Sequence, residues 1–101
     1  MLYFDGCPNW IGTEAALREA LEAVGAADTR IERNLVTTLE EASRVGFTGS
    51  PTVLIDGRDP FAEPTAPVAL ACRMYRTESG LAGTPSRKQL IAALQTRMDD
   101  R

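Results

Sequence analysis

Two cysteines carry the most reactive side chains in this chain of 101 residues, which contains no histidine. The lack of histidine excludes Ser-His-Asp and Cys-His catalysis, imidazole metal sites and a histidine pH switch. Cys7 lies in the turn-rich stretch 5–8, and Cys72 lies far along the chain, after a proline-rich segment. Because the thiolate is the reactive form of cysteine, thiol chemistry is what these two positions could perform.

Cys7 stands directly before Pro8 and an amphipathic stretch in which Leu17, Ala20 and Leu21 recur at helical spacing. If the helix starts at Pro8, Cys7 is its N-cap, where free amides and the helix dipole stabilise a thiolate. We therefore expect the Cys7 sulfur to be open to water and ionised. The alternative is a small apolar residue that is buried in the loop and inert.

Cys72 has two possible placements. In the first, Cys72 opens a predicted strand over 72–77, and in an ordinary hairpin the start of that strand lies far from Cys7. Cys72 would then be a buried strand residue, and this placement leads because buried cysteine is the commoner case. The excursion over 58–71, which is too rich in proline for a regular helix or central strand, could instead return the chain to Cys7. Cys72 would then be a resolving cysteine, or half of a soft-metal pair with Cys7.

The elements that must position these residues follow from the hydrophobic pattern. We predict strands over 2–4, 29–36, 52–55 and 72–77 and helices over 8–24, 37–46 and 84–98. Asp56-Gly57 predicts a reversal after the third strand, and Gly80 and Gly83 a turn before the last helix. The last helix is expected to start at Thr84-Pro85 and to bury Leu90, Ile91, Leu94 and Met98.

The predicted order is β-α-β-α-β-β-α. It favours one α/β domain over 1–101, with a mixed four-stranded sheet flanked by helices on both faces. The composition is that of an ordinary globular protein, with 44% hydrophobic and 25% charged residues.

Charge and hydropathy indicate which kinds of partner and which cellular location to expect. The net charge is −3, and basic residues alternate with acidic ones, which argues against a nucleic-acid partner. The first residues form no signal peptide, and no apolar run approaches a membrane span, so a cytoplasmic location is expected. In a reducing compartment, thiols are expected rather than a structural disulfide.

Two motifs resemble the thioredoxin-like family. Residues 4–10, FDGCPNW, occupy the place of the family's C-x-x-C motif, and residues 49–52, GSPT, look like its cis-proline loop. The sequence is similar to small bacterial thioredoxin-like proteins, some of which carry the name alkylmercury lyase. Trp10 stands where the second cysteine of the motif would fall, so the resemblance implies a monothiol arrangement closer to monothiol glutaredoxins.

The resemblance also implies the roles of further residues. The Ser50–Pro51 bond is expected to be cis, with Ser50 lining the site and its backbone pairing with an extended substrate. Pro8 and Trp10 join these two as candidate substrate contacts. Trp10 is either a lid over Cys7, a partner contact, or an aromatic residue packed on the core.

The leading function is thiol–disulfide exchange without cofactor or metal, on a protein or low-molecular-weight thiol or disulfide. Cys7 would attack, and Cys72 or an external thiol would resolve the intermediate. One alternative is a non-catalytic binding module of the same fold. The other is organomercurial or soft-metal binding by Cys7 and Cys72. The acidic residues Asp56, Asp59 and Glu63 are interpreted as a solvated turn.

Overall fold

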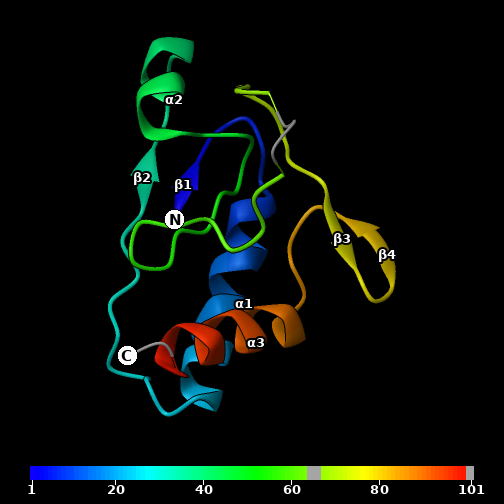
Figure 1. The fold of residues 1–101 in the computed structure, drawn as a ribbon. Coiled ribbons are helices and arrows are strands. Elements are labelled where there is room, and N and C mark those ends of the chain that lie inside the picture. The colour runs from blue at the N-terminus through cyan, green and yellow to red at the C-terminus, as the bar shows by residue number, and fades with distance from the viewer. Residues whose placement is uncertain (64–66, 100–101) are drawn as a thin grey trace.

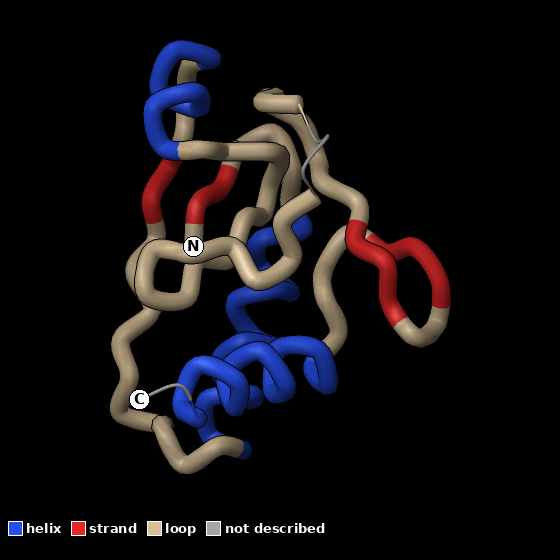
Figure 2. The backbone as a smooth tube through the Cα atoms, viewed as in Figure 1, coloured by secondary structure: helices blue, strands red, loops and turns tan. Residues whose placement is uncertain are grey.

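Strands and helices alternate through the first half of the chain, as the hydrophobic pattern predicts. The computed structural model describes residues 1–63 and 67–99, so part of the expected excursion over 58–71 lies outside the described residues. Within them it forms a mixed α/β fold in which long loops join short strands (Figures 1 and 2). The elements are β1 (Leu2–Tyr3), α1 (Asn9–Ala23), β2 (Asn34–Leu35), α2 (Leu39–Val45), β3 (Tyr75–Thr77), β4 (Gly80–Ala82) and α3 (Arg87–Asp99).

The described strands form two small sheets. β1 and β2 run parallel, with Leu2 opposite Asn34, and β3 and β4 form an antiparallel hairpin. The predicted third strand over 52–55 is reduced to isolated bridges, one of which joins Thr52 to Leu2 through two backbone hydrogen bonds of 2.8 and 2.9 Å. Pro51 has no N–H to extend this ladder, and the chain reverses directly after Ile55.

The predicted reversal at Asp56-Gly57 is confirmed. Both residues have positive φ, 52° and 81°, and Ile55 pairs with Arg58 across them. This is the backbone that a two-residue hairpin requires, and glycine adopts it without steric cost.

The core consists of two clusters on opposite sides of segment 52–55. Val53 packs into the cluster between α1 and α3, while Leu54 packs against the cluster below α2. In Figure 1, α1 and α3 accordingly lie together and α2 lies apart from them. The buried members are Leu17, Ala20, Leu21, Val53, Leu90 and Leu94 in the first cluster and Leu2, Val36, Ala42 and Phe47 in the second.

The caps of α2 lie within the predicted helix range 37–46, whereas α3 starts later than predicted. The Thr38 side chain accepts a hydrogen bond from Glu41 N, and Gly46 closes α2 in the left-handed conformation. The start of α3 is instead formed by Ser86, whose hydroxyl accepts from Gln89 N while Gln89 Oε1 accepts from Ser86 N. This reciprocal capping box moves the start two residues beyond the predicted Thr84-Pro85.

Three further predictions about packing and strands are wrong in detail. Met98 is 45% exposed, so it is not part of the buried stripe of α3. Only Asn34–Leu35 of the predicted strand 29–36 is extended in a ladder, and there Leu35 faces solvent while the next residue, Val36, is buried. Gly80 begins β4 rather than a turn.

None of the helices within residues 1–63 and 67–99 is long and apolar enough to cross a lipid bilayer.

Candidate functional site

Cys7 lies in the connection between β1 and α1. Its amide donates a hydrogen bond of 3.1 Å to the carbonyl of Phe4, which closes a tight turn after the strand. The N-cap of α1 is Pro8, so the prediction that Cys7 is the N-cap is wrong by one residue, and Cys7 directly precedes the cap. Pro8 has no side-chain acceptor for the first-turn amides. Cys7 thus directly precedes the N-cap of a helix of 15 residues, whose amino-terminal end is the positive end of the helix dipole.

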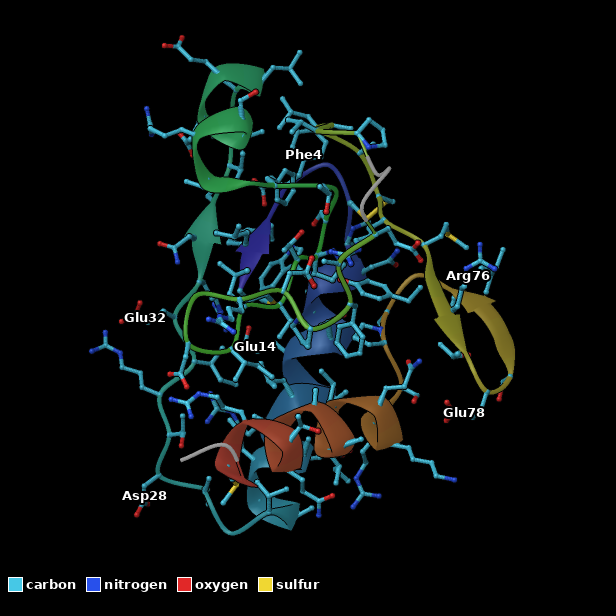
Figure 3. All side chains as sticks on the ribbon, viewed as in Figure 1. Phe4, Glu14, Asp28, Glu32, Arg76 and Glu78 are labelled. Atoms are coloured by element: carbon cyan, nitrogen blue, oxygen red, sulfur yellow. A yellow bond between two sulfur atoms is a disulfide. The ribbon has the colours of Figure 1, made fainter. Side chains whose placement is uncertain are left out.

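Cys7 and Cys72 form a disulfide (Figure 3). Their Cα atoms are 5.5 Å apart although 65 residues separate them in sequence. The leading expectation for Cys72, a buried strand residue remote from Cys7, is therefore wrong. By Cys72 the chain has returned to the start of α1, and β3 begins only at Tyr75.

The two cysteines differ in exposure. Cys7 is 1% exposed, whereas Cys72 is an exposed residue outside the strands. The expectation that Cys7 is an open, ionised thiolate is thus wrong for this disulfide-bonded state. Cys72 is thus the more exposed residue of the bonded pair.

The cis-proline loop lies against both cysteines. The Ser50–Pro51 bond is cis, as the resemblance implies. The carbonyl oxygen of Ser50 is 3.7 Å from Cys7 Sγ, and the Ser50 hydroxyl accepts a hydrogen bond of 3.0 Å from Phe4 N. Ser50 is fully buried and holds the β1–α1 turn and the proline loop together.

The backbone of Ser50 already has partners within the chain. Its amide donates to the carbonyl of Ala71 at 2.7 Å, and its carbonyl accepts from Arg73 N at 2.9 Å. This pair of bonds forms a parallel bridge between Ser50 and Cys72. The expected pairing of this residue with an extended substrate would have to displace that segment.

Pro8 and Trp10 are less buried than Cys7 and Ser50. Pro8 directly follows Cys7 and is exposed. The Trp10 ring packs on Tyr3 of β1, with ring centroids 4.7 Å apart, and the Arg33 guanidinium lies 5.2 Å from its centroid. Of the three predicted roles for Trp10, these contacts favour packing.

Arg73 and Tyr75 belong to the site and were missed by the sequence reasoning. Arg73 is only 7% exposed, and its guanidinium forms an ion pair of 2.7 Å with Asp59. Tyr75 is buried and donates a hydrogen bond from its hydroxyl to the carbonyl of Pro51. A basic residue at an inward position of an alternating segment, directly after a cysteine, is the signal that could have pointed to Arg73.

The acidic residues of the reversal and the excursion each face an arginine. Asp56 pairs with Arg97, Asp59 with Arg73, and Glu63 with Arg76. Among residues 1–63 and 67–99 there is no group of three or more Cys, Asp or Glu side chains that could hold a metal ion. The side chains of Asp56 and Glu63 are 54% exposed, in agreement with the interpretation of a solvated turn, whereas Asp59 is 15% exposed and does not fit it.

Comparison with known proteins finds no matching family model, no matching curated protein and no matching solved structure.

Proposed function

We propose that this chain is a thioredoxin-like thiol–disulfide oxidoreductase whose redox centre is the Cys7–Cys72 pair. The observation that carries the proposal is the bond between these cysteines beside the cis Ser50–Pro51 peptide, at the start of α1. The pairing of Thr52 with Leu2 of β1 and the clusters on the two sides of segment 52–55 are compatible with the four-stranded sheet of that family.

The difference in exposure favours Cys72 as the sulfur at which exchange starts. A thiolate RS⁻ would attack Cys72 Sγ, form an RS–S bond to Cys72 and expel Cys7 as a thiolate. The dipole of α1, which begins two residues after Cys7, would favour that thiolate as the leaving group, and thiols of low pKa leave faster. A second RS⁻ then attacks the sulfur of the bound RS group, which forms RSSR and releases the Cys72 thiolate.

The reaction balances as two thiols oxidised to one disulfide while the Cys7–Cys72 bond is reduced to two thiols. In the reverse direction the reduced protein reduces a substrate disulfide, with Cys72 as the attacking thiolate and Cys7 as the resolving thiol. This reverses the roles that the sequence predicted for the two cysteines. Trp10 at the position of the family's second cysteine is no obstacle, because Cys72 supplies the second thiol.

Two single variants test this order of attack. With oxidised glutathione as the probe, Cys7→Ser should accumulate one glutathionyl group on Cys72, because the resolving thiol is missing. Cys72→Ser leaves the buried Cys7 and should acquire the group far more slowly, which intact-mass spectrometry measures. An adduct that forms faster on Cys7 would restore the original roles.

The burial of Cys7 favours one rival, a binding module in which the disulfide is only structural. The unmodified protein should accelerate the reduction of a small aromatic disulfide by reduced glutathione, whereas Cys7→Ser/Cys72→Ser should not. Equal rates for the two proteins would support the binding module. Stoichiometric mercury binding that survives Cys72→Ser would dismiss a shared soft-metal site.

A further inference from the structure

Arg73 is the residue after Cys72, and its guanidinium is held from several sides. Nη1 donates to Asp59 Oδ2 at 2.7 Å and to Thr48 Oγ1 at 3.3 Å, and Nη2 donates to the carbonyl of Phe61. The guanidinium carbon also lies 4.5 Å from the centroid of the Tyr75 ring. A buried cation with this many partners fixes the segment that carries it.

The backbone of the same segment lies tightly on the proline loop. Arg73 N and the Ala71 carbonyl bond the two backbone groups of Ser50, one on each side of Cys72. Gly49 has φ of 120°, and a Cβ atom added there would lie 2.8 Å from Cβ of Arg73. Only glycine at residue 49 permits this approach without a shift of the backbone.

None of these contacts passes through a sulfur atom. Reduction breaks the Cys7–Cys72 bond and adds two electrons and two protons, which come from two external thiols. The ion pair with Asp59 and the bonds to Ser50 do not depend on that bond. The segment can therefore keep its place after reduction, with Cys72 still opposite Cys7.

We infer that Arg73 is a positioning residue that holds Cys72 beside Cys7 in the reduced protein. This inference rests on the proposed function, since it explains how the two thiols re-form their bond. Thiols held in this way have a high effective concentration relative to one another, which favours the intramolecular disulfide. The planar fork of the arginine is needed for its separate acceptors, and lysine reproduces only its charge.

The test is the equilibrium of the protein with mixtures of reduced and oxidised glutathione. The fraction of protein in each state is read by alkylation and intact mass, and it gives the equilibrium constant for Cys7–Cys72 formation. Arg73→Lys and Asp59→Asn should lower this constant by about tenfold or more, because the thiols lose their fixed separation. Arg76→Lys is the matched control: Arg76 lies in the same segment, is exposed and pairs only loosely with Glu63 at 3.7 Å. It should stay within about twofold of the unmodified protein.

A second measurement uses the unmodified protein and does not depend on variants that fold. In the reduced state the amides of Ser50 and Arg73 should remain protected from hydrogen exchange, because their ladder persists. Unprotected exchange of both amides on reduction would overturn the inference, as would an unchanged equilibrium constant in a folded Arg73→Lys protein.

The inference and the proposed function fail separately. Suppose that the unmodified protein catalyses no exchange, but Arg73→Lys lowers the equilibrium constant for Cys7–Cys72 formation. The positioning role of Arg73 is then supported and the enzymatic function is rejected. Suppose instead that the unmodified protein catalyses exchange and that Arg73→Lys has the same equilibrium constant for Cys7–Cys72 formation. The proposed function is then supported, and Arg73 is not a positioning residue.

Discussion

Tyr75 joins the arginine cluster to the cis-proline loop. Its ring lies beneath the Arg73 guanidinium, and its hydroxyl donates to the carbonyl of Pro51. Burial is the main cause that raises the pKa of Tyr75 far above its usual value of 10.0; the nearby Arg73 lowers the pKa and Asp59 raises it. The phenol is thus held neutral as a hydrogen-bond donor.

This shift predicts how stability depends on alkaline pH. The folded-state pKa is raised, so above about pH 10 the unfolded chain loses the Tyr75 proton while the folded chain keeps it. The stabilisation is complete below pH 10 and is lost as the pH rises toward the folded-state pKa. The free energy of unfolding should therefore fall more steeply with alkaline pH in the unmodified protein than in Tyr75→Phe.

Alkaline titration of the phenol absorbance checks the prediction. The folded protein contains Tyr3 and Tyr75. If Tyr75 stays neutral, the absorbance change near pH 10 should be the same in the unmodified protein and in Tyr75→Phe. A larger change in the unmodified protein than in Tyr75→Phe would contradict the raised pKa of Tyr75.

At the scale of elements, the β3–β4 hairpin is fastened to the start of α3. Besides capping the helix, Ser86 donates a hydrogen bond of 3.0 Å from its hydroxyl to Glu78, and Gln89 Nε2 donates to the carbonyl of Arg76. Figure 3 shows Arg76 and Glu78 on this hairpin. The capping box therefore links α3 to the segment that continues from Cys72.

Replacement of the cap measures this link. Ser86→Ala should lower the free energy of unfolding by about 1 kcal/mol, because an amide of the first turn loses its acceptor. Thr84→Ala is the control at the position that the sequence predicts as the cap; Thr84 donates only to the neighbouring carbonyl of Pro85. Urea denaturation of both variants decides between the positions, and a larger loss in Thr84→Ala would contradict the observed cap.

The helices were predictable from the sequence because their signals are local. The repeat of Leu17, Ala20 and Leu21 depends on residues that lie within a few positions of one another. The short strands were less predictable, because whether Leu35 or Val36 faces the core is decided by distant partners.

The site was predictable only in part, for the same reason. Cys7 and the Ser50–Pro51 bond were identified from motifs, one at each end of the first half of the chain. The place of Cys72 depends on contacts of Arg73 with Asp59, Phe61 and Thr48, which are 12 to 25 residues away. No periodic pattern in the proline-rich excursion encodes those contacts, so the sequence alone left both placements of Cys72 open.

At the scale of the whole molecule, the Cys7–Cys72 bond closes a loop across most of the chain, with a sequence separation of 65 residues. A link of this length restricts the unfolded chain, and the chain-entropy relation gives about 4 kcal/mol of stabilisation. Reduction should lower the free energy of unfolding by about this amount even if every native contact of Arg73 survives. Urea denaturation with and without reductant measures the loss, and Cys7→Ser/Cys72→Ser should be indifferent to the reductant.

The redox equilibrium must agree with that loss, because the two quantities close one thermodynamic cycle. One quantity is the ratio of the effective concentration of the two thiols in the folded protein to that in the unfolded chain. This ratio determines how much the free energy of unfolding of the oxidised protein exceeds that of the reduced protein. A loss of about 4 kcal/mol corresponds to a ratio of roughly a thousandfold. If Arg73→Lys lowers the folded-state value about tenfold, its loss on reduction should shrink by about 1.4 kcal/mol. If a variant changed the glutathione equilibrium of the folded protein but not its loss of stability on reduction, the effective concentration in the unfolded chain would have to change by the same factor, and Arg73 would then not act on the folded state alone.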